Sequence, residues 1–471
     1  MNDMHRRLWF GTTRAIFRAI TFTLAAVLII AGSHSSARAT VQYQTLKSFE
    51  GGAAGASPYA GVIMATDGML YGTTYSGGAS NLGTVFRFGP ANGSYSVLHS
   101  FSASPDDGKN PESHLIEGTD GALYGTTYYG GGGAGLGTIF KIHNDGSGFT
   151  ILKSLSGTGG YYLQAALSRG PDGTLFGATR MQGAFPSFFA GFVFRLNPDG
   201  SGFMRLADVP ELATTGGVLL ASDGALYGTG SSLGAASGSS SFYRVTTDGS
   251  TNSINYFSNL IGRDQPISTL VEGLDGWLYA MSADGVVKMT KDGSATQIVY
   301  RFDPVDNSAH GSDLLVGVDG TLYGARFEGG DANAGFVFQI APDGSNLVIL
   351  HSFSTNGIDG TNPLAGLFRA SDGTLYGTTS AGGSSGVGTI FSLRLPPPSP
   401  KLLLPLVSPD GVVIRFSAPA GKTYLVQRSS ALNGTWLTLT NLEASAEGAA
   451  QFLDSTPLST SGFYRVTEAG P

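Results

Sequence analysis

The sequence predicts an all-β protein, a seven-bladed β-propeller with first-to-last strand closure, followed by a small β-sandwich domain. A hexapeptide, Asp-Gly-x-Leu-Tyr-Gly with small variations, occurs seven times. Its copies begin at Asp67, Asp120, Asp172, Asp223, Asp275, Asp319 and Asp372, at spacings of 53, 52, 51, 52, 44 and 53 residues. A fixed period near fifty residues is typical of propeller blades. The composition agrees, because 71 of 471 residues are glycine while only 13% are charged, as in a packed β protein rich in turns.

Residues 1–39 are expected to be a signal peptide. A basic N-terminal region precedes an apolar run of 13 residues, and Ala37-Arg38-Ala39 provides a cleavage site. An uncleaved membrane anchor is the alternative, but spanning a bilayer takes about 20 apolar residues. We therefore expect a mature chain that starts at Thr40 and is exported, to the periplasm, the cell surface or the extracellular space.

The charge balance and the lack of cysteine limit the classes of binding partner and the kinds of catalytic or metal site that the chain can have. Removal of residues 1–39 takes away five Lys/Arg and one Asp, which leaves 22 basic and 33 acidic residues, a balance of −11. An acidic chain without basic clusters argues against nucleic acid as a partner and against stable membrane insertion after signal cleavage. The chain has no cysteine, which rules out thiol nucleophiles and cysteine-ligated metals. No cofactor is expected.

Each repeat reads as a four-stranded meander. In the seventh copy an apolar strand precedes Asp372-Gly373, which is expected to form a type I′ turn with positive φ at both residues. Two further strands follow, but the fourth is missing because Leu395 runs into prolines. Residues 43–49 match the fourth strand at residues 95–101, so the N-terminal strand is expected to complete the last blade and close the ring.

Four regions follow from this pattern: a signal peptide at 1–39, the propeller at 40–395, a proline-rich linker at 396–400 and an Ig/fibronectin-like β-sandwich at 401–471. The Asp-Gly turns of the propeller are short and lie on one face, where the repeated aspartates are turn residues and not calcium ligands. The longer loops and the inter-blade links lie on the other face, where binding is expected.

Ligand-binding candidates on that long-loop face are charged or aromatic groups of the loops and links. They are Asp106, Asp107, Lys109, Arg180, Phe185, Arg263, Asp264, Asp306 and His310. A second set lies three positions before the repeated aspartate, on first strands that are expected to line a central channel. It comprises Glu117, Arg169, Glu272 and Arg369, for which ion pairing in a wet channel is the simpler interpretation.

Repeated positions are interpreted as structural. The aromatic residue of each hexapeptide is expected to pack between blades, and the glycine after it to admit a neighbouring blade. His99 and His351 share a fourth-strand position with Lys47 and Lys153, so that position is expected to face solvent. No paired metal-ligand spacing and no nucleophile-elbow motif is present, and neither a metal site nor a catalytic residue is predicted.

The repeats resemble those of the choice-of-anchor GloVer tandem-repeat proteins, an exported bacterial group. The shared pattern runs from the aspartate-glycine pair through Leu-Tyr-Gly-Thr-Thr and a glycine loop to Gly-Thr-Val/Ile-Phe, at residues 67–86, 120–140 and 372–391. The resemblance implies export and residence at the surface or outside the cell, and it brings no catalytic motif.

The sequence thus favours an exported, non-catalytic propeller that binds a glycan, peptide or protein through its long-loop face. The alternative is a polysaccharide lyase or glycosidase that uses Glu117 or Glu272, which would need a raised carboxyl pKa. A structural component of a surface layer is a third possibility.

Overall fold

A computed structural model describes two parts of the chain, which form separate compact units, Val41–Leu395 and the segment from Pro396 onward. In the larger unit the described residues are 41–132, 135–155, 162–163, 166–180, 191–209, 212–214, 216–232, 240–256, 267–302 and 312–395. In the smaller unit they are 396, 401–402, 406–408, 411–418, 422–431, 434–444, 449–456 and 463–469. The expected signal peptide lies outside the described residues. Within them, no helix has the length and hydrophobicity to span a bilayer.

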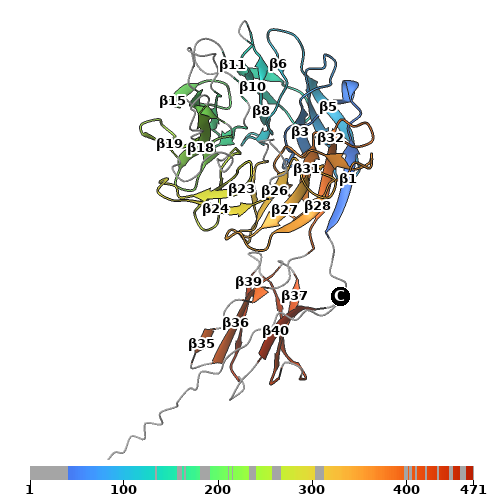
Figure 1. Cartoon of the computed structure of the whole chain (residues 1–471), viewed down its shortest axis with the longest axis vertical. Helices are drawn as coiled ribbons and strands as arrows, with labels where there is room; N and C mark the ends of the chain where they lie inside the picture. Colours follow the sequence, from blue (N-terminus) through green and yellow to red (C-terminus); the bar gives the residue numbers. More distant parts are fainter. Residues whose placement is uncertain are drawn as a thin grey trace, which may run out of the picture. The chain divides into compact units, whose positions relative to one another are not determined.

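The larger unit is built from antiparallel sheets that follow one another around a common centre in chain order (Figure 1). We number them sheets 1 to 7. Sheet 1 contains β2 (Ile63–Met64), β3 (Leu70–Thr74), β4 (Thr84–Phe88) and β5 (Tyr95–Ser100), and sheet 2 contains β7 (Ile116–Glu117), β8 (Leu123–Thr127), β10 (Thr138–Ile142) and β11 (Thr150–Ser154). Sheet 3 contains β12 (Ser168–Arg169), β13 (Leu175–Ala178), β14 (Gly191–Leu196) and β15 (Met204–Val209). Sheet 4 contains β17 (Leu219–Leu220), β18 (Ala225–Ser232), β19 (Ser240–Thr246) and β20 (Asn252–Tyr256), and β16 (Leu212–Thr214) also pairs with β18.

The last three sheets repeat the pattern. Sheet 5 contains β21 (Val271–Glu272), β22 (Leu278–Met281), β23 (Gly285–Met289) and β24 (Thr296–Arg301), and sheet 6 contains β25 (Leu315–Val316), β26 (Leu322–Arg326), β27 (Phe336–Ile340) and β28 (Val348–Ser352). Sheet 7 contains β30 (Phe368–Arg369), β31 (Leu375–Thr379), β33 (Thr389–Arg394) and β1 (Gln42–Ser48). Two short ribbons, β6 (Gly108–Lys109) with β9 (Tyr129–Gly130) and β29 (Gly360–Thr361) with β32 (Ala381–Gly382), join links to loops, and a 3-10 turn spans Gly52–Ala54.

Sheet 7 takes its fourth strand from the N-terminus. β1 pairs antiparallel with β33 from Gln42–Arg394 to Ser48–Thr389. In Figure 1 the blue β1 accordingly lies beside the orange strands of sheet 7. Strands from the two ends of this unit therefore share one sheet, and each covers an edge that the other would leave unpaired.

Apolar clusters join each sheet to the next. Six of them link sheets 1 to 7 in series. A further cluster contains Phe49 and Ile390 of the sheet 7 side together with Leu70 and Phe86 of sheet 1. Hydrogen bonds repeat the relationship, because Thr73 Oγ1 of sheet 1 donates to the Ser113 carbonyl (3.2 Å) ahead of sheet 2 and Thr378 Oγ1 of sheet 7 to the Ala60 carbonyl (2.8 Å) ahead of sheet 1. The contact between sheets 7 and 1 thus has the same form as the contact between sheets 1 and 2.

The Asp-Gly turns differ from the expected type I′ geometry. In the first copy Gly68 has φ of 77°, while Asp67 is not among the residues with positive φ. The Gly68 amide donates to the Ala65 carbonyl (2.9 Å), and the Asp67 carboxylate accepts the Met69 amide (3.0 Å). The expectation of positive φ at both residues is therefore wrong. Thr66 and Asp67 occupy the centre of the turn, and the glycine takes the left-handed position after it.

The glycine after each repeat aromatic accommodates a ring of its own sheet, so the expectation of a neighbouring blade is also wrong. Gly125 lies opposite Phe140 across the β8–β10 pair, and a Cβ on Gly125 would be 2.5 Å from Phe140 Cζ. Sheet 5 has Ala280 at this position, and there the opposite residue is the smaller Val287. Tyr124, by contrast, is fully buried in the cluster between sheets 2 and 3, which confirms the expected packing role of the repeat aromatic.

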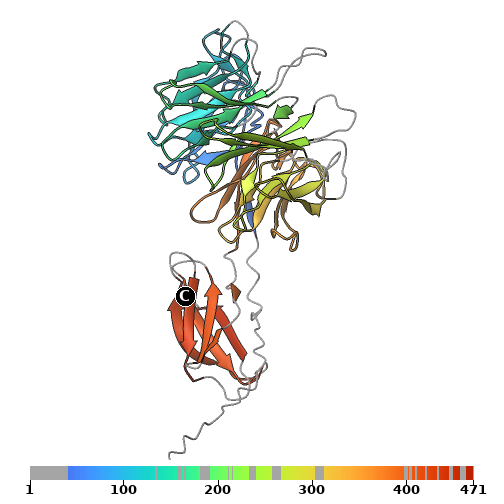
Figure 2. The same cartoon turned by 90° about the vertical axis from the view of Figure 1, so that its left-hand side faces the viewer.

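The smaller unit contains two sheets (Figure 2). One is formed by β34 (Lys401–Leu402), β35 (Leu406–Ser408), β36 (Gly411–Ser417) and β39 (Ala449–Asp454), and the other by β37 (Thr423–Ser429), β38 (Leu437–Glu443) and β40 (Phe463–Glu468). Phe416 of the first and Tyr424 of the second belong to one buried cluster. Asp454 of the first accepts hydrogen bonds from Arg428 (2.6 Å) and Tyr464 (2.7 Å) of the second. Apolar and polar contacts thus both connect the two sheets.

Candidate functional site

The strand order of each sheet places the longer connections on one face of the larger unit. Since the strands are antiparallel and consecutive, the loop after the second strand and the link after the fourth emerge on the same side. The short ribbons agree with this, because Gly108 of a link pairs with Gly130 of a loop, and Gly360 pairs with Gly382 in the same way. We call this side the long-loop face.

Asp107, which is a predicted ligand-binding residue, is hydrogen-bonded within its own link. It is 7% exposed, and it accepts hydrogen bonds from the Ser102 amide and hydroxyl (both 2.9 Å) and from the Gly108 amide (2.8 Å). Its other contact is His99 Nε2 at 3.3 Å. Burial raises the pKa of Asp107, but the hydrogen bonds from His99 and Ser102 outweigh it and hold the pKa below the ordinary value. The carboxylate therefore fixes the link.

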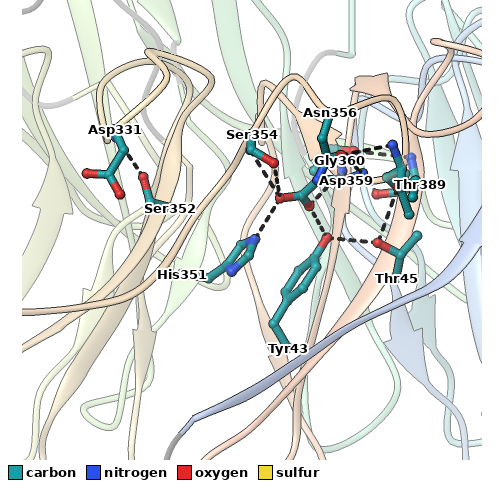
Figure 3. A network of polar contacts seen from close by, with 12 residues as sticks. Tyr43, Thr45, Asp331, His351, Ser352, Ser354, Asn356, Asp359, Gly360 and Thr389 are labelled. Atoms are coloured by element: carbon teal, nitrogen blue, oxygen red, sulfur yellow. Dashed lines mark hydrogen bonds and ion pairs between the residues drawn. The ribbon is translucent and has the colours of Figure 1, made fainter.

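Asp359 repeats this arrangement ahead of sheet 7, as Figure 3 shows. Its carboxylate accepts hydrogen bonds from the Ser354 amide (3.1 Å) and the Tyr43 hydroxyl (2.5 Å), and it lies 3.0 Å from His351 Nε2. Its pKa is likewise lowered, because hydrogen bonds from His351 and Tyr43 outweigh the effect of burial. The signal for both networks was present in the sequence, since His-Ser-Phe-Ser followed by Asp-Gly occurs at residues 99–108 and 351–360.

The fourth-strand position that holds His99, His351, Lys47 or Lys153 was expected to face solvent. The structure shows that it does not. His351 stacks on Tyr43 and His99 on Phe149, each pair with ring centroids 3.6 Å apart. Where the position is lysine, Lys47 lies 4.4 Å from the centre of the Tyr95 ring. Imidazole and ammonium groups can both pack on an aromatic face, so the position holds a contact between neighbouring sheets.

The two first-strand glutamates connect neighbouring sheets. Glu117 of sheet 2 accepts hydrogen bonds from the Thr66 amide (3.0 Å) and hydroxyl (2.7 Å) of sheet 1. Glu272 of sheet 5 accepts them from the Ser222 amide (2.7 Å) and hydroxyl (2.6 Å) of sheet 4. Lys291 Nζ lies 2.7 Å from Glu272. Burial acts to raise the pKa of Glu272, but the hydrogen bonds from Lys291 and Ser222 make the net shift downward.

The remaining predicted residues are dispersed. Asp106 is exposed in its link, Lys109 is half-buried in β6, Arg169 is exposed on β12 and Arg369 is half-buried on β30. Arg180 is half-buried directly after β13, and its amide donates to the Tyr162 carbonyl (3.0 Å). The other five candidates lie outside the described residues: Phe185, Arg263, Asp264, Asp306 and His310.

Five tyrosines lie in two neighbouring groups on the long-loop face, which we call the tyrosine cluster. Tyr59 stacks on Tyr75 with centroids 4.6 Å apart, and Tyr128 stacks on Tyr162 at 4.3 Å. Tyr129 meets both members of the second pair edge-on, at 4.6 and 5.2 Å. Asn110 joins the two groups, because its side-chain amide donates to the Tyr75 carbonyl (2.9 Å) and its carbonyl accepts the Tyr128 amide (3.2 Å). Tyr75 and Tyr128 directly follow β3 and β8, while Tyr59 and Tyr162 lie in links, so the cluster draws on the surroundings of three sheets.

The tyrosine cluster differs from the repeat tyrosines in exposure and hydrogen bonding. Tyr71 is fully buried and donates its hydroxyl to Asp67 (2.7 Å), and equivalent bonds recur in other copies. Tyr129 is 39% exposed, and the other four are half-buried. The hydroxyls of Tyr59, Tyr75, Tyr128 and Tyr129 bond to no other residue that the structure describes. Their polar ends are therefore available to a ligand.

One acidic group, Glu112, and two basic groups, Arg180 and Lys109, accompany the cluster, and Lys109 is paired with Tyr129 across the β6–β9 ribbon. The pKa of Tyr75 is raised by burial and by the Glu112 carboxylate. Burial also raises the pKa of Tyr128, which the Arg180 guanidinium opposes and Glu112 reinforces. Glu112 and Arg180 thus both act on Tyr128. Arg180 was predicted from the sequence, but the tyrosines and Glu112 were not, although Tyr128-Tyr129 and Tyr161-Tyr162 are conspicuous pairs.

Hydrogen bonds join residues that lie just ahead of the first strands of sheets 4, 5 and 6. The Asp313 carboxylate accepts the Thr269 amide (2.7 Å), and Thr269 Oγ1 accepts the Gly217 amide (2.9 Å). Desolvation lowers the pKa of His114, and the negative charge of Asp313 opposes that shift. In the described part of the chain, no group of three or more His, Asp or Glu side chains could hold a metal ion.

A comparison with known protein families identifies the family to which the repeats belong. The family described as the Gloeobacter/Verrucomicrobia repeat matches residues 34–209 and 282–412. The chain belongs to this family. The two matched regions include the hexapeptides of sheets 1 to 3, 6 and 7, and the GloVer resemblance of the repeats is thereby confirmed. No curated protein matches the chain.

Several solved structures are similar to this Gloeobacter/Verrucomicrobia repeat protein. The extracellular domain of a B. thetaiotaomicron protein assigned to the one-component systems has 11% identity and a TM-score of 0.48, over 88% of this chain and 54% of its own. An oligogalacturonate lyase from Vibrio parahaemolyticus has 12% identity and a TM-score of 0.48, over 76% and 97%. A gluconolactonase from Xanthomonas campestris has 16% identity and a TM-score of 0.40, over 76% and 90%. The chain thus spans about half the length of the first of these proteins, and similarity at this level gives no information about activity.

Proposed function

We propose that this repeat protein is an exported, non-catalytic, seven-bladed β-propeller that binds a glycan, peptide or protein through its long-loop face. Sheets 1 to 7 are the blades, and β1 closes the ring by first-to-last strand exchange. The pairing of β1 with β33 and the apolar cluster between sheets 7 and 1 support closure. The C-terminal unit is a small β-sandwich of Ig/fibronectin type, supported by the core that its two sheets share.

The difference between the two kinds of tyrosine carries the binding proposal. Four tyrosines of the hexapeptides, Tyr71, Tyr124, Tyr227 and Tyr279, are fully buried and donate their hydroxyls to the repeated aspartates. The rings of the tyrosine cluster, by contrast, are partly exposed on the face with the long loops. Folding alone gives no reason to gather five partly exposed aromatic residues on one face, and partly exposed tyrosines are common in binding surfaces.

A non-catalytic role agrees with the engagement of the first-strand glutamates. A glycosidase acid needs a carboxyl group with a raised pKa, but the Glu272 pKa is lowered and its oxygens bind Ser222 and Lys291. Both Glu272 and Glu117 bridge adjacent sheets, and this structural use accounts for their repeated position without catalysis.

Binding by the long-loop face is tested by probing glycan and peptide arrays with the chain from Thr40 to Pro471. We expect one array to give reproducible hits, and a Tyr75→Ala, Tyr128→Ala double variant to lose them. Leu274→Ala with Val318→Ala is the matched control, because these side chains are 70% and 80% exposed and lie in Asp-Gly turns of the opposite face. Hits that survive the tyrosine substitutions, or are lost equally in the control, would contradict the proposal.

A further inference from the structure

We infer that the tyrosine cluster is a binding site for a neutral carbohydrate chain. This inference rests on the proposed binding function of the long-loop face and adds the class of ligand. It follows from the kind of group that the cluster presents, from its balance of charge and from its extent across several sheets.

The cluster offers the two kinds of contact that sugars use. A pyranose ring has an apolar face of C–H groups, which can pack on an aromatic ring, and an equatorial rim of hydroxyls. Tyr129 is 39% exposed beside the stacked pair Tyr128 and Tyr162, and it provides such a surface. The unbonded hydroxyls of Tyr59, Tyr75 and Tyr128 can each donate one hydrogen bond and accept others, which suits a ligand that carries a hydroxyl on most of its carbon atoms.

The charges near the cluster favour a neutral ligand. Charged groups of both signs lie beside the cluster: Glu112 and Arg180 both act on Tyr128, and Lys109 pairs with Tyr129. The expected mature chain is acidic overall, with a balance of −11, and repels polyanions such as uronate polymers. A basic or acidic peptide would gain little from a site with this balance, whereas a neutral glycan needs no counter-charge.

The extent of the cluster favours a chain over a single sugar. Its members come from the surroundings of sheets 1, 2 and 3, and consecutive ring contacts of 4.3 to 5.2 Å connect Tyr128, Tyr129 and Tyr162. The Tyr59–Tyr75 pair extends the surface toward sheet 1. Each aromatic contact is weak by itself, so several sugar units bound along the cluster provide the affinity that one unit lacks.

Affinity electrophoresis with polysaccharides in the gel tests the inference. The chain from Thr40 to Pro471 is run through gels that contain neutral glucomannan, xyloglucan, arabinoxylan or β-glucan, or acidic polygalacturonate or alginate. We expect retardation by at least one neutral polymer and by neither acidic one, followed by titration calorimetry with oligosaccharides of the retarding polymer. Tyr75→Ala and Tyr128→Ala should each weaken that binding by about tenfold, within the range measured for single aromatic stacking contacts.

Further variants keep the test independent of folding. Tyr129→Ala truncates the most exposed ring and should weaken binding without changing the melting temperature, and Tyr128→Phe should weaken it less than Tyr128→Ala because it keeps the ring. Leu274→Ala with Val318→Ala is the control for apolar adsorption. Retardation by the acidic polymers alone, or neutral binding that the tyrosine variants leave unchanged, would overturn the inference. Peptide-array hits lost in the same variants, without glycan binding, would overturn it while the proposed function stands, and no binding of either class would remove both.

Discussion

The imidazole of His351 stacks on the phenol ring of Tyr43, with centroids 3.6 Å apart and planes within 4° of parallel. His351 lies in the fourth strand of sheet 6, one residue before its end, and Tyr43 belongs to the N-terminal strand that completes sheet 7. Asp359 joins the same pair by accepting the Tyr43 hydroxyl and contacting the imidazole (Figure 3). A single group of three side chains therefore holds the N-terminal strand to the neighbouring sheet and to the link between them.

Removal of the Tyr43 ring should destabilise the larger unit substantially. Tyr43 is half-buried, and Tyr43→Ala loses the stack and the hydrogen bond to Asp359. We expect it to lower the free energy of unfolding by about 3 kcal/mol, the lower end of the range for large aromatic residues in cores. Tyr43→Phe keeps the stack and should cost only about 1 kcal/mol. Chemical denaturation measures both, with Tyr129→Ala as the exposed control. Equal losses for Tyr43→Ala and Tyr129→Ala would show that the group does not hold the strand.

Stability should fall in acid partly through Asp107 and Asp359. Their pKa values are lowered in the folded protein, so the stability that they contribute is complete above the pKa of about 3.9 in the unfolded chain and is lost as the pH drops through the folded value. The Asp107→Asn, Asp359→Asn variant should have a lower melting temperature than the parent at pH 7. The difference should shrink as the pH falls below about 4, and a difference that stays constant below this pH would contradict the linkage.

The glycine and the aromatic ring opposite it should be energetically coupled. Gly125→Ala places a Cβ 2.5 Å from Phe140 Cζ, and such overpacking typically costs about 1–3 kcal/mol. Phe140→Val removes the ring and reproduces the Ala280–Val287 pairing of sheet 5. We expect the double variant to be more stable than the sum of the single losses by at least about 0.5 kcal/mol in a double-mutant cycle. Additive losses would mean that the two positions do not constrain each other.

Substitution of the first-strand glutamates should affect stability and leave ligand binding unchanged. Glu117→Gln and Glu272→Gln each weaken charge-assisted hydrogen bonds to the preceding sheet, and a loss of about 1–2 kcal/mol is expected for each. Binding of an array ligand or polysaccharide should keep its affinity, because neither residue belongs to the tyrosine cluster. Loss of binding without loss of stability would indicate that the ligand binds at these carboxylates.

The sequence predicted most of what repetition determines. A strand order copied at a fixed period identified consecutive strands, the turn role of Asp67 and its equivalents, and the packing role of Tyr124. It did not predict which side chain packs against Gly125, because a glycine in a strand indicates a close contact but does not identify the contacting residue. The solvent-facing interpretation of His99 and His351 failed for a related reason. Lysine at an equivalent position suggested hydration, yet Lys47 and His351 both pack on a ring from the next sheet.

The candidate site was harder to predict because most repeats lack its tyrosines. Tyr75 and Tyr128 share the position after the second strand, but that position is Arg180 in the third copy and differs again in later ones. Tyr59 and Tyr162 come from links, and only the alignment of neighbouring sheets brings each beside its partner. Charged residues were favoured from the sequence, and one of them, Asp107, is hydrogen-bonded within its own link. Among the described candidates, Arg180 and Lys109 lie by the tyrosine cluster, because Arg180 bonds to Tyr162 and Lys109 pairs with Tyr129. Exposure and hydrogen bonding, which separate free side chains from engaged ones, depend on the assembled structure.

The pairing of β1 with β33 has a consequence for biogenesis. Tyr43 and its strand partner Leu393 are 350 residues apart, so during synthesis the first strand emerges long before its partner. Until then β1 has no sheet to join, and its unpaired edges can pair with other chains. Completion of the fold depends on one contact of very high sequence separation, which favours slow folding. A chain shortened anywhere before β33 would carry an N-terminal strand with no partner, so truncated products should aggregate or be degraded instead of persisting as smaller versions of the protein.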